Sequence, residues 1–212
     1  PRGAITATSH LLGRTERAAL QQSLASATIL ADDKPVCHAS GGFAPLVPPP
    51  GVTLGPLPWE RTEPAPVGAV DIGMLDQQER AILKACDAAL AKASDHHPFI
   101  RHFWGGIPRR SVQGARNAVA IGPHIANRVG HVQGGILIGL AASNACAAAP
   151  PEMMLSNISA WYIRPGRGTA LRIRSRILHA GRTVTVVRTE IKDAGGERVL
   201  EATSNHVARI RA

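Results

Sequence analysis

A run of small apolar residues from Ile136 to Ala149 constrains the fold of this chain more than any other segment. Gly134-Gly135 opens the run and Pro150-Pro151 closes it, and no charged residue interrupts it. A helix formed here is apolar all round, so we expect it to be buried on every side. The two prolines cannot continue a helix and fix its end. The sequence therefore predicts a central helix around which the rest of a domain is built.

Segments with the alternating pattern of β-strands surround this helix in the sequence. A strand is expected before the helix, and four strands with short Gly-containing turns between them are expected after it. The expected strands are 112–123, 154–164, 169–179, 183–193 and 199–210. Successive antiparallel strands and one buried helix give an α+β fold, in which a sheet wraps round the helix.

The start of the chain repeats part of its end. Strands are expected at 4–12, 18–31 and 36–46, and the alternation in the first of them predicts a half-buried strand. Two sets of residues recur later in the chain. The offset is 166 between Ile5, Ala7, Ser9, Leu11 and Leu171, Ile173, Ser175, Ile177. The offset is 163 between Val36, Ala39, Ser40 and Val199, Ala202, Thr203. We interpret the first copy as incomplete, because it holds counterparts only of the last three strands. Its missing part comes either from another chain or from residues lost before Pro1.

Four segments follow from this pattern. Residues 1–46 are the C-terminal strands of a first unit, 47–70 a Pro-rich linker, 71–111 a helix and connecting loop, and 112–212 a complete second unit. The linker holds Pro48-Pro49-Pro50, and a ligand for an SH3-type module is the alternative interpretation. The helix is expected at 76–94, with an irregular stretch at 95–110. That stretch contains His96, His97 and His102, which indicate either a metal site or a solvated loop; we expect no metal.

Net charge and cysteine content limit the classes of binding partner and the cellular setting that we expect. Lys+Arg 24 against Asp+Glu 15 gives a net charge of +9, which suits either nucleic acid or a phosphorylated small ligand. The arginines are scattered in the sequence and aromatics are only 3%, so we favour the small ligand and expect no nucleic-acid partner. Cys37, Cys86 and Cys146 have no CxxC spacing, which argues against a disulfide framework and fits a reducing, cytoplasmic setting. The longest apolar run is shorter than the roughly 20 residues that span a bilayer, so we expect no membrane partner.

The segment Asn127-Arg128-Val129-Gly130-His131-Val132-Gln133-Gly134-Gly135 resembles the N-x-x-G-x-x-H-G-G signature of hotdog-fold acyl-CoA thioesterases. The small-residue helix after it and Tyr162-Ile163-Arg164-Pro165-Gly166-Arg167-Gly168 also resemble that family, especially its phenylacetate-degradation branch. The resemblance covers about residues 112–210, and 3–46 as the tail of a second copy. The whole chain is therefore similar to a double-hotdog protein with an incomplete first copy.

This resemblance implies hydrolysis of an acyl-CoA thioester to the free acid and CoA, without a metal or redox cofactor. The implied catalytic residues are Asn127, Gln133 and Gly135; the implied substrate-binding residues are Gly134, His131, Arg128, Asn157, Arg164 and Arg167. The N–H groups of two glycines at a helix start can hold a carbonyl oxygen as it becomes negative. Asn127 is equally suited to capping its own loop, and Gln133 to starting the helix. Each arginine has a solvated surface role as its alternative. Hotdog units pair, so a homodimer or a pairing of units is also implied.

Two departures from the family pattern leave the chemistry open. The histidine of H-G-G is Gln133 here, and the helix acid nine positions later is Ala142. Three explanations are open. The acid comes from the helix of a paired unit, or this unit is catalytically inactive. The third explanation is that uncharged groups order the water, with Asn157 at the family's Asp and Thr183 and Ser204 near its Thr and Gln. The rival functions are a non-catalytic acyl-CoA-binding or assembly protein and a hotdog hydratase or dehydratase. The latter needs a paired acid and histidine, which the sequence lacks at family spacing.

Overall fold

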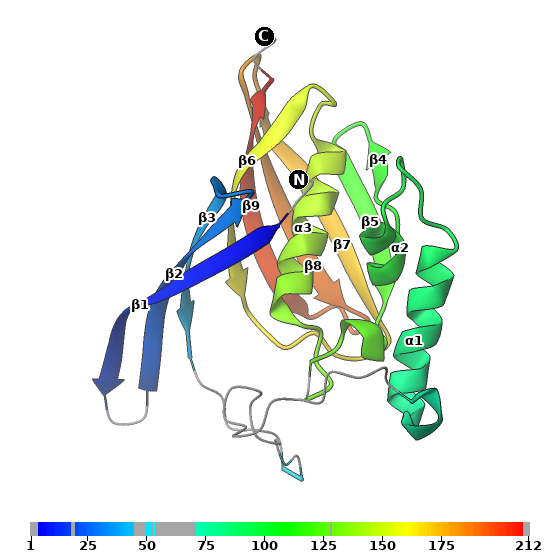
Figure 1. Cartoon of the computed structure of the whole chain (residues 1–212). Coiled ribbons are helices and arrows are strands. Elements are labelled where there is room, and N and C mark those ends of the chain that lie inside the picture. Colours follow the sequence, from blue (N-terminus) through cyan, green and yellow to red (C-terminus); the bar gives the residue numbers. More distant parts are fainter. Residues whose placement is uncertain are drawn as a thin grey trace. The chain divides into compact units, whose positions relative to one another are not determined.

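A computed structural model describes residues 4–17, 20–44, 50–51, 53, 71–127 and 129–209. The chain divides into two units, Pro1–Leu54 and Gly55–Ala212, and each is described here by itself (Figure 1). The predicted linker at 47–70 lies almost entirely outside the described residues. No helix among the described residues is both long and apolar enough to cross a membrane.

The second unit is a six-stranded antiparallel sheet with one long helix, α3 (Gly134–Ala148), lying against one face (Figure 1). The strand order is β4-β5-β7-β8-β9-β6. The strands are β4 (Arg109–Ser111), β5 (Gly114–Ala120), β6 (Met153–Tyr162), β7 (Ala170–Ala180), β8 (Val184–Asp193) and β9 (Arg198–Ala208). This arrangement confirms the predicted α+β fold, a sheet wrapped round a helix, and each of the four strands after α3 forms within a few residues of its predicted bounds.

The face of α3 turned toward the sheet makes the core. Its buried residues are Leu137, Leu140, Ala141, Asn144, Ala145 and Ala148, and they meet inward side chains such as Leu171, Ile173, Ile191 and Leu200. Burial on every side was the expectation, and it is wrong, because Gly135, Ser143 and Cys146 are exposed. The apolar pattern did not predict this exposure, because the exposed positions carry small side chains, and contact of a small side chain with water costs little free energy.

The first unit is a three-stranded antiparallel sheet in the order β1 (Ile5–Arg17), β2 (Leu20–Ala31), β3 (Lys34–Phe43). In the turn after β2, Asp32 and Asp33 are both at positive φ (47° and 60°). The half-buried character predicted for the first strand is wrong, since Ile5 and Leu11 are 62% and 66% exposed. Alternation in the sequence marks a potential apolar face, but no described helix packs on that face within this unit.

The internal repeat is visible in the pairing of the strands. β1-β2-β3 and β7-β8-β9 are both antiparallel and follow chain order. The β1–β2 ladder shifts register between Leu11 and Gly13, and the β7–β8 ladder shifts between Ile177 and His179. These positions differ by the same offset of 166 that relates the two sequences. A shared bulge at a shared position is what a true structural repeat predicts, because bulges are built-in features of a strand.

Residues 71–126 form the first part of the second unit that the structure describes. A short 3-10 helix, η2 (Ile72–Met74), precedes α1 (Gln77–Leu90), which starts with a capping box in which Asp76 and Glu79 each accept the other's backbone N–H at 2.8 Å. The stretch expected to be irregular contains α2 (Phe99–Trp104) and β4, so that expectation is wrong. A six-residue helix is too short for a periodic sequence signal. The strand predicted at 112–123 begins only at Gly114, and a 3-10 helix, η3 (Pro123–Ile125), takes its last residue.

Asn144 ties α3 to two strands through polar contacts inside the core. Its fully buried amide Nδ2 donates to the carbonyl oxygen of Ala115 at 3.2 Å and to Oγ of Ser175 at 2.7 Å. Ser175 Oγ in turn lies 2.7 Å from Thr189 Oγ1 on the neighbouring strand. Buried hydrogen bonds of this kind fix the rotation of the helix, because turning it would take the amide donor away from both acceptors, although Asn144 Oδ1 is buried without a partner among the described residues.

We predict that Asn144→Ala lowers the free energy of unfolding by about 1–3 kcal/mol, because it leaves the buried acceptors at Ala115 and Ser175 without their donor. Urea unfolding followed by circular dichroism measures the change. Ser143→Ala, at the exposed neighbouring position, is the control and should stay within about 0.5 kcal/mol of the parent chain. Equal stability of the Asn144 variant and the parent chain would show that this network does not hold α3.

Candidate functional site

The first turn of α3 presents free backbone donors. Gln133 is the N-cap: its side-chain Oε1 and its carbonyl oxygen both lie 3.0 Å from the N–H nitrogen of Ile136, and the carbonyl also accepts from Leu137 at 3.1 Å. The N–H groups of Gly134 and Gly135 have no acceptor among the described residues. Together with the positive end of the helix dipole, two such donors attract a carbonyl oxygen that gains negative charge.

Tyr162 covers one side of this helix start. Its hydroxyl donates to the carbonyl oxygen of Gly134 at 2.9 Å, and a Cβ added at Gly134 would lie 3.4 Å from the ring. Burial raises the pKa of Tyr162 above its ordinary value, so the hydroxyl stays protonated and able to donate. Tyr162 is not among the site residues predicted from the sequence. The signal was present, because Ile158 and Ala160 point inward from β6 and Tyr162 continues the same alternation.

The loop before α3 is held by Asn127. The side-chain Oδ1 of Asn127 accepts the N–H groups of Val129 and His131, both at 3.0 Å, and its backbone N–H donates to the carbonyl oxygen of His131 at 2.6 Å. Of the two interpretations of Asn127, the structure therefore shows the loop cap, and only the amide Nδ2 is left to meet a substrate. The loop closes onto the helix, since the N–H of Gln133 donates to the carbonyl oxygen of Ile125 at 2.9 Å.

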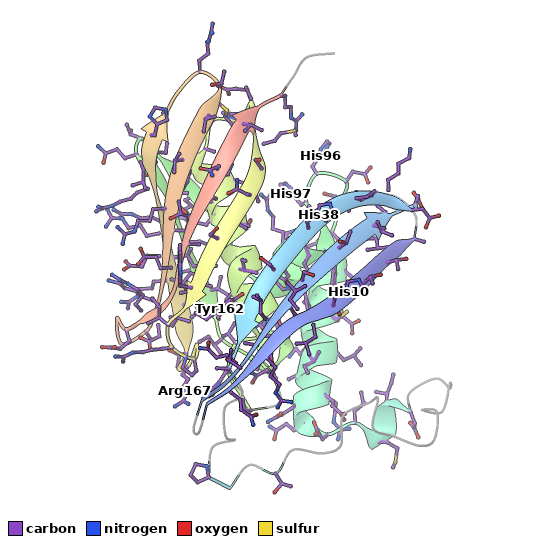
Figure 2. The ribbon with its side chains drawn as sticks, turned by 90° about the vertical axis from the view of Figure 1, so that its left-hand side faces the viewer. His10, His38, His96, His97, Tyr162 and Arg167 are labelled. Carbon is purple, nitrogen blue, oxygen red and sulfur yellow. The ribbon has the colours of Figure 1, made fainter. Side chains whose placement is uncertain are left out.

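His131 and Arg167 form a second contact beside the helix start. Nε of Arg167 donates to Nε2 of His131 at 2.8 Å, which requires the imidazole to be neutral at that nitrogen. Partial burial and, next, the charge of Arg167 hold the pKa of His131 below its ordinary 6.5. The two residues come from loops on either side of β6, and Figure 2 marks Arg167 and Tyr162 on the second unit.

Three predicted residues are not joined to this group by any described contact. Arg164 forms an exposed ion pair with Glu197 in the turn between β8 and β9. Asn157 accepts a hydrogen bond from the side chain of Asn205 at 3.1 Å, across the β6–β9 ladder. Arg128 lies outside the described residues. The structure thus brings together Asn127, His131, Gln133, Gly134, Gly135 and Arg167, and gives Arg164 and Asn157 other partners.

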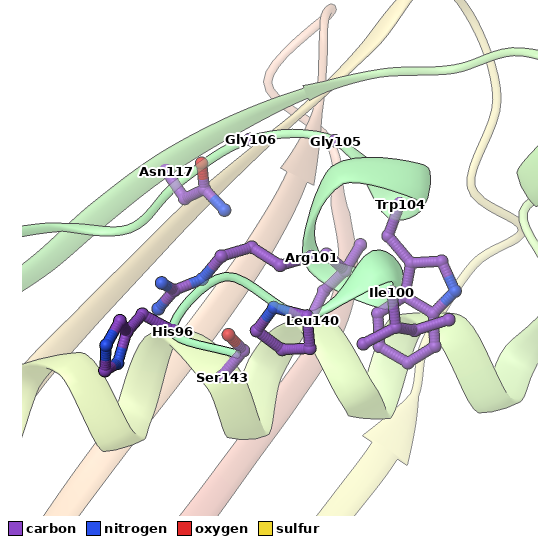
Figure 3. A pocket seen from close by; sticks show the side chains of 10 residues that line it. His96, Ile100, Arg101, Trp104, Gly105, Gly106, Asn117, Leu140 and Ser143 are labelled. Atoms are coloured by element: carbon purple, nitrogen blue, oxygen red, sulfur yellow. The ribbon is translucent and has the colours of Figure 1, made fainter. Parts of the chain in front are cut away.

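A pocket of about 290 Å³ lies further along α3, where α2 and its flanking loops approach the helix (Figure 3). Trp104, Leu140, Ile100 and Pro98 supply apolar walls, and Arg101, His96, Asn117 and Ser143 supply polar groups. Trp104 sits directly on Gly139: a Cβ there would lie 2.5 Å from two ring carbons. Figure 3 shows the Arg101 side chain extending between Asn117 and Ser143 toward His96. No acidic side chain pairs with Arg101 among the described residues.

This pocket was missed by the sequence analysis, which treated the histidine-rich stretch as a metal site or a loop. Arg101 Nη1 lies 3.3 Å from Nδ1 of His97, and the rings of His97 and His102 meet edge to face. Within the described ranges, no group of three His, Cys, Asp or Glu side chains is arranged to hold a metal ion.

The sequence of the second unit matches a known protein family, and its structure resembles solved structures. Residues 123–207 match the family model of the acyl-CoA thioesterase N-terminal domain. A Bacillus halodurans protein solved with CoA shares 22% identity and a TM-score of 0.58, over 67% of this chain and 100% of that one. This likeness establishes the hotdog fold of the second unit.

Two further solved structures agree less well with this chain. A conserved protein from Pseudomonas aeruginosa shares 23% identity over 55% of this chain and 95% of its own, with a TM-score of 0.48. A hypothetical thioesterase from Streptococcus pneumoniae, solved with coenzyme A, shares 19% identity over 50% of this chain and 86% of its own, with a TM-score of 0.47. None of the curated proteins matches the chain.

We predict that His131 titrates below pH 6.5 and that Arg167→Gln raises its pKa part of the way back, since burial remains. Because the folded state binds the proton less readily, this residue's contribution to stability is complete above pH 6.5 and is lost as the pH falls through the folded pKa. NMR titration of the imidazole C–H resonances measures both values. Arg164→Gln, which breaks a pair with Glu197, is the control. A His131 pKa at or above 6.5 would contradict the observed contact.

Proposed function

Because the second unit is a hotdog domain of the acyl-CoA thioesterase superfamily, we propose that this chain hydrolyses acyl-CoA thioesters to a free acid and CoA. The observation that carries the proposal is the pair of free N–H groups at Gly134 and Gly135, on the exposed start of a helix. The neighbouring contacts fix those donors in place before substrate arrives, which is the condition for strong stabilisation of a developing charge.

The thioester oxygen would accept the N–H of Gly135, with Gly134 beside it, as water adds to the carbonyl carbon. As the water adds, it gives one proton to a base, the C=O bond becomes a single bond and its oxygen becomes negative. The oxygen then returns its electrons, the C–S bond breaks, and the proton passes from the base to the departing sulfur, so that the free acid and the CoA thiol are released. Gln133 contributes from the same turn, because its Oε1 caps Ile136 while its Nε2 remains a donor. Asn127 acts as a positioning residue, since its Oδ1 is engaged by the loop.

The group that removes a proton from water is the open part of this mechanism. No carboxylate occurs from Gly134 to Ala149, and Ala142 stands where the phenylacetate-degradation branch has its acid. We propose that the helix of a paired hotdog unit with a different sequence supplies that acid, because a second copy of α3 would lack the carboxylate as well. The shared register shift of the two three-stranded segments supports a double hotdog as the ancestral arrangement. Among the described residues of this unit, the His131 imidazole lies in the loop before the helix start, where its Nε2 accepts from Arg167.

The CoA part of the substrate carries phosphates. We propose that Arg167 and Arg128 bind these phosphates, and that Arg164 also does so when its ion pair with Glu197 opens. Asn157 keeps a water-ordering role only as a prediction, because its contact is to Asn205. No resident metal or redox cofactor is part of the reaction, and CoA enters only as part of the substrate. The three free cysteines suit a reducing, cytoplasmic setting.

The pocket beside Trp104 is the proposed receptor for the acyl group. Ser143 lies on the same exposed stripe of α3 as Gly135, two turns further on, or about 12 Å at 1.5 Å per residue. An acyl chain that starts at Gly135 and follows this stripe reaches the apolar wall formed by Trp104 and Leu140. The pocket volume, about 290 Å³, is at the small end of ligand sites and favours a short or compact acyl group.

A non-catalytic acyl-CoA-binding protein is the second candidate, and the missing carboxylate on α3 specifically favours it. Hydrolysis of a panel of short, aromatic and long acyl-CoA esters, followed by detection of the free thiol, distinguishes the two. Turnover of at least one ester supports the thioesterase. No turnover by the full chain, together with measurable binding of CoA esters, would leave only the binding function.

We predict that Gln133→Glu slows turnover about 10²- to 10³-fold, because it removes the Nε2 donor and places a negative charge beside the oxyanion. The variant keeps an acceptor for the Ile136 N–H, so its melting temperature should not fall. Asn127→Asp is the matched variant, which keeps both loop hydrogen bonds and loses only Nδ2. Its rate should stay within about threefold of the parent if Asn127 only positions the loop. An unchanged rate in Gln133→Glu would remove Gln133 from the site.

We also predict that Ser143→Phe, which fills the pocket beside Trp104, lowers kcat/KM about tenfold or more for bulky acyl groups and little for acetyl-CoA. One bulky acyl contact is commonly worth about 1–3 kcal/mol, or about tenfold to two hundredfold. Cys146→Phe adds the same ring one turn further along the exposed stripe, outside the pocket, and should leave the acyl preference unchanged. Equal effects of both variants on all esters would place the acyl group elsewhere.

A further inference from the structure

The outer face of the sheet, opposite α3, carries a dense array of basic side chains. The alternation of β7 alone places Arg172, Arg174 and Arg176 on one face, and strand pairing adds basic residues of β4, β5, β8 and β9 to them. The array, called the basic face below, consists of Arg109, Arg116, Arg172, Arg174, Arg176, Arg188, Lys192 and Arg198. Figure 2 shows long side chains of β7 and β8 projecting from this side of the sheet.

Like charges stand directly opposite one another across this face. The like-charged opposed pairs in the ladder registers are Arg109–Arg116, Arg116–Arg174, Arg172–Lys192, Arg176–Arg188 and Lys192–Arg198, while Arg174 also stands opposite the acidic Glu190. Like charges in directly opposed positions of a sheet destabilise it. Folding by itself therefore disfavours this arrangement, and an anionic partner is what would compensate for it.

In the part of the chain that the structure describes, acidic side chains within the face form ion pairs only with the basic residues of β8 and β9. Glu190 pairs with Lys192 and Arg198 at 3.4 and 2.7 Å, and Glu201 pairs with Arg188 and Arg198 at 2.5 and 3.1 Å. Both acids lie on β8 and β9. The four arginines on β5 and β7 have no ion pair among the described residues, and they are exposed; they are Arg116, Arg172, Arg174 and Arg176.

The shape and composition of the basic face select among anionic partners. The face spans five strands that lie about 4.8 Å apart, with arginines about 6.7 Å apart along β7, so it is broad rather than a single-ligand cleft. No aromatic side chain stands among the arginines of β5 and β7, and a single-stranded nucleic acid needs such stacking platforms. The aromatic residue on this side is Trp161, at the edge strand β6, directly opposite Glu201 and 58% exposed. Glu201 itself is paired with Arg188 and Arg198, and an exposed tryptophan at the margin of a basic surface is typical of membrane–water interfaces.

We propose that the basic face docks this protein on the surface of an anionic phospholipid bilayer. The guanidinium groups pair with lipid phosphates, and Trp161 enters the headgroup region at the edge of the contact. This mode of binding needs no spanning segment, so it differs from the membrane partner that the sequence analysis excluded. Because the basic face lies on the side of the sheet away from α3, docking leaves the helix start at Gly134 open to solution.

Flotation of the full chain with lipid vesicles tests the proposal. Binding is expected to vesicles of phosphatidylcholine mixed with phosphatidylglycerol and not to phosphatidylcholine alone. It should weaken steeply between about 0.05 and 0.5 M salt, since surface charges are screened over that range. Absence of binding to the mixed vesicles at low salt would overturn the proposal, as would tighter capture by a DNA duplex than by the vesicles at equal salt.

The variant Arg116→Thr/Arg174→Thr removes one opposed pair from the centre of the face. Each arginine near a lipid surface contributes about fivefold to binding, so the partition coefficient should fall roughly thirtyfold. Its melting temperature should not fall, because a repulsive pair is lost and Thr suits a strand. Arg172→Gln/Arg176→Gln is a second variant with the same expected loss of binding.

The matched control is Arg80→Gln/Lys84→Gln, which removes the same charge from the exposed side of α1. Its vesicle binding should stay within about twofold of the parent chain. A loss equal to that of the Arg116/Arg174 variant would show that net charge alone, and not the basic face, drives binding. Thioester hydrolysis without vesicles should be the same in all three variants, so this test is independent of the proposed enzymatic function.

Discussion

The packing of α3 against the inner face of the sheet is the interaction on which the second unit depends. Ala141, Ala145 and Ala148 let the helix approach the strands closely, and Asn144 fixes its rotation through Ala115 and Ser175. Once rotation and depth are set, one stripe of small residues has to face away from the sheet. That stripe begins at Gly135, so the same packing that builds the core also determines where free backbone donors meet solvent.

The chemistry of the site follows from how the helix start is supported. Side-chain oxygens of Asn127 and Gln133 satisfy the loop and one helix N–H, while Tyr162 holds the carbonyl of Gly134. Each of these contacts fixes backbone geometry and leaves the N–H groups of the two glycines free. A site built from main-chain donors is rigid before substrate arrives, and this is how electrostatic stabilisation becomes effective. Under the proposed function, the missing carboxylate is the part that a paired hotdog unit would supply.

Much of the fold could be predicted from local patterns. The glycines and prolines around α3 mark its ends, and the alternation in β7 correctly places Leu171 and Ile173 inside and Arg172 and Arg174 outside. Local sequence patterns did not predict those features of the structure that depend on contacts with other helices and strands. Apolar character could not reveal which stripe of α3 stays exposed, and the six-residue α2 gave no periodic signal.

The position of the candidate residues was predictable, but their contacts were not. The sequence places Asn127 and Gln133 just before the helix, and the structure has them there, yet the sequence could not say whether their amide oxygens cap the backbone or face a ligand. Tyr162 and Trp104 were missed because their roles arise from contacts with Gly134 and Gly139, far away in sequence. The basic face was missed for a related reason, since it depends on the register between strands rather than on spacing within one.

The central claim is that the N–H groups at the start of α3 receive the thioester carbonyl. It is tested most directly by amide NMR of the full chain with a non-hydrolysable ketone analogue of an acyl-CoA, compared with CoA alone. The account predicts that the amide resonances of Gly134 and Gly135 and the side-chain amide of Gln133 shift with the analogue and much less with CoA. If the analogue binds while these three resonances stay where CoA alone leaves them, the carbonyl lies elsewhere and the account is wrong.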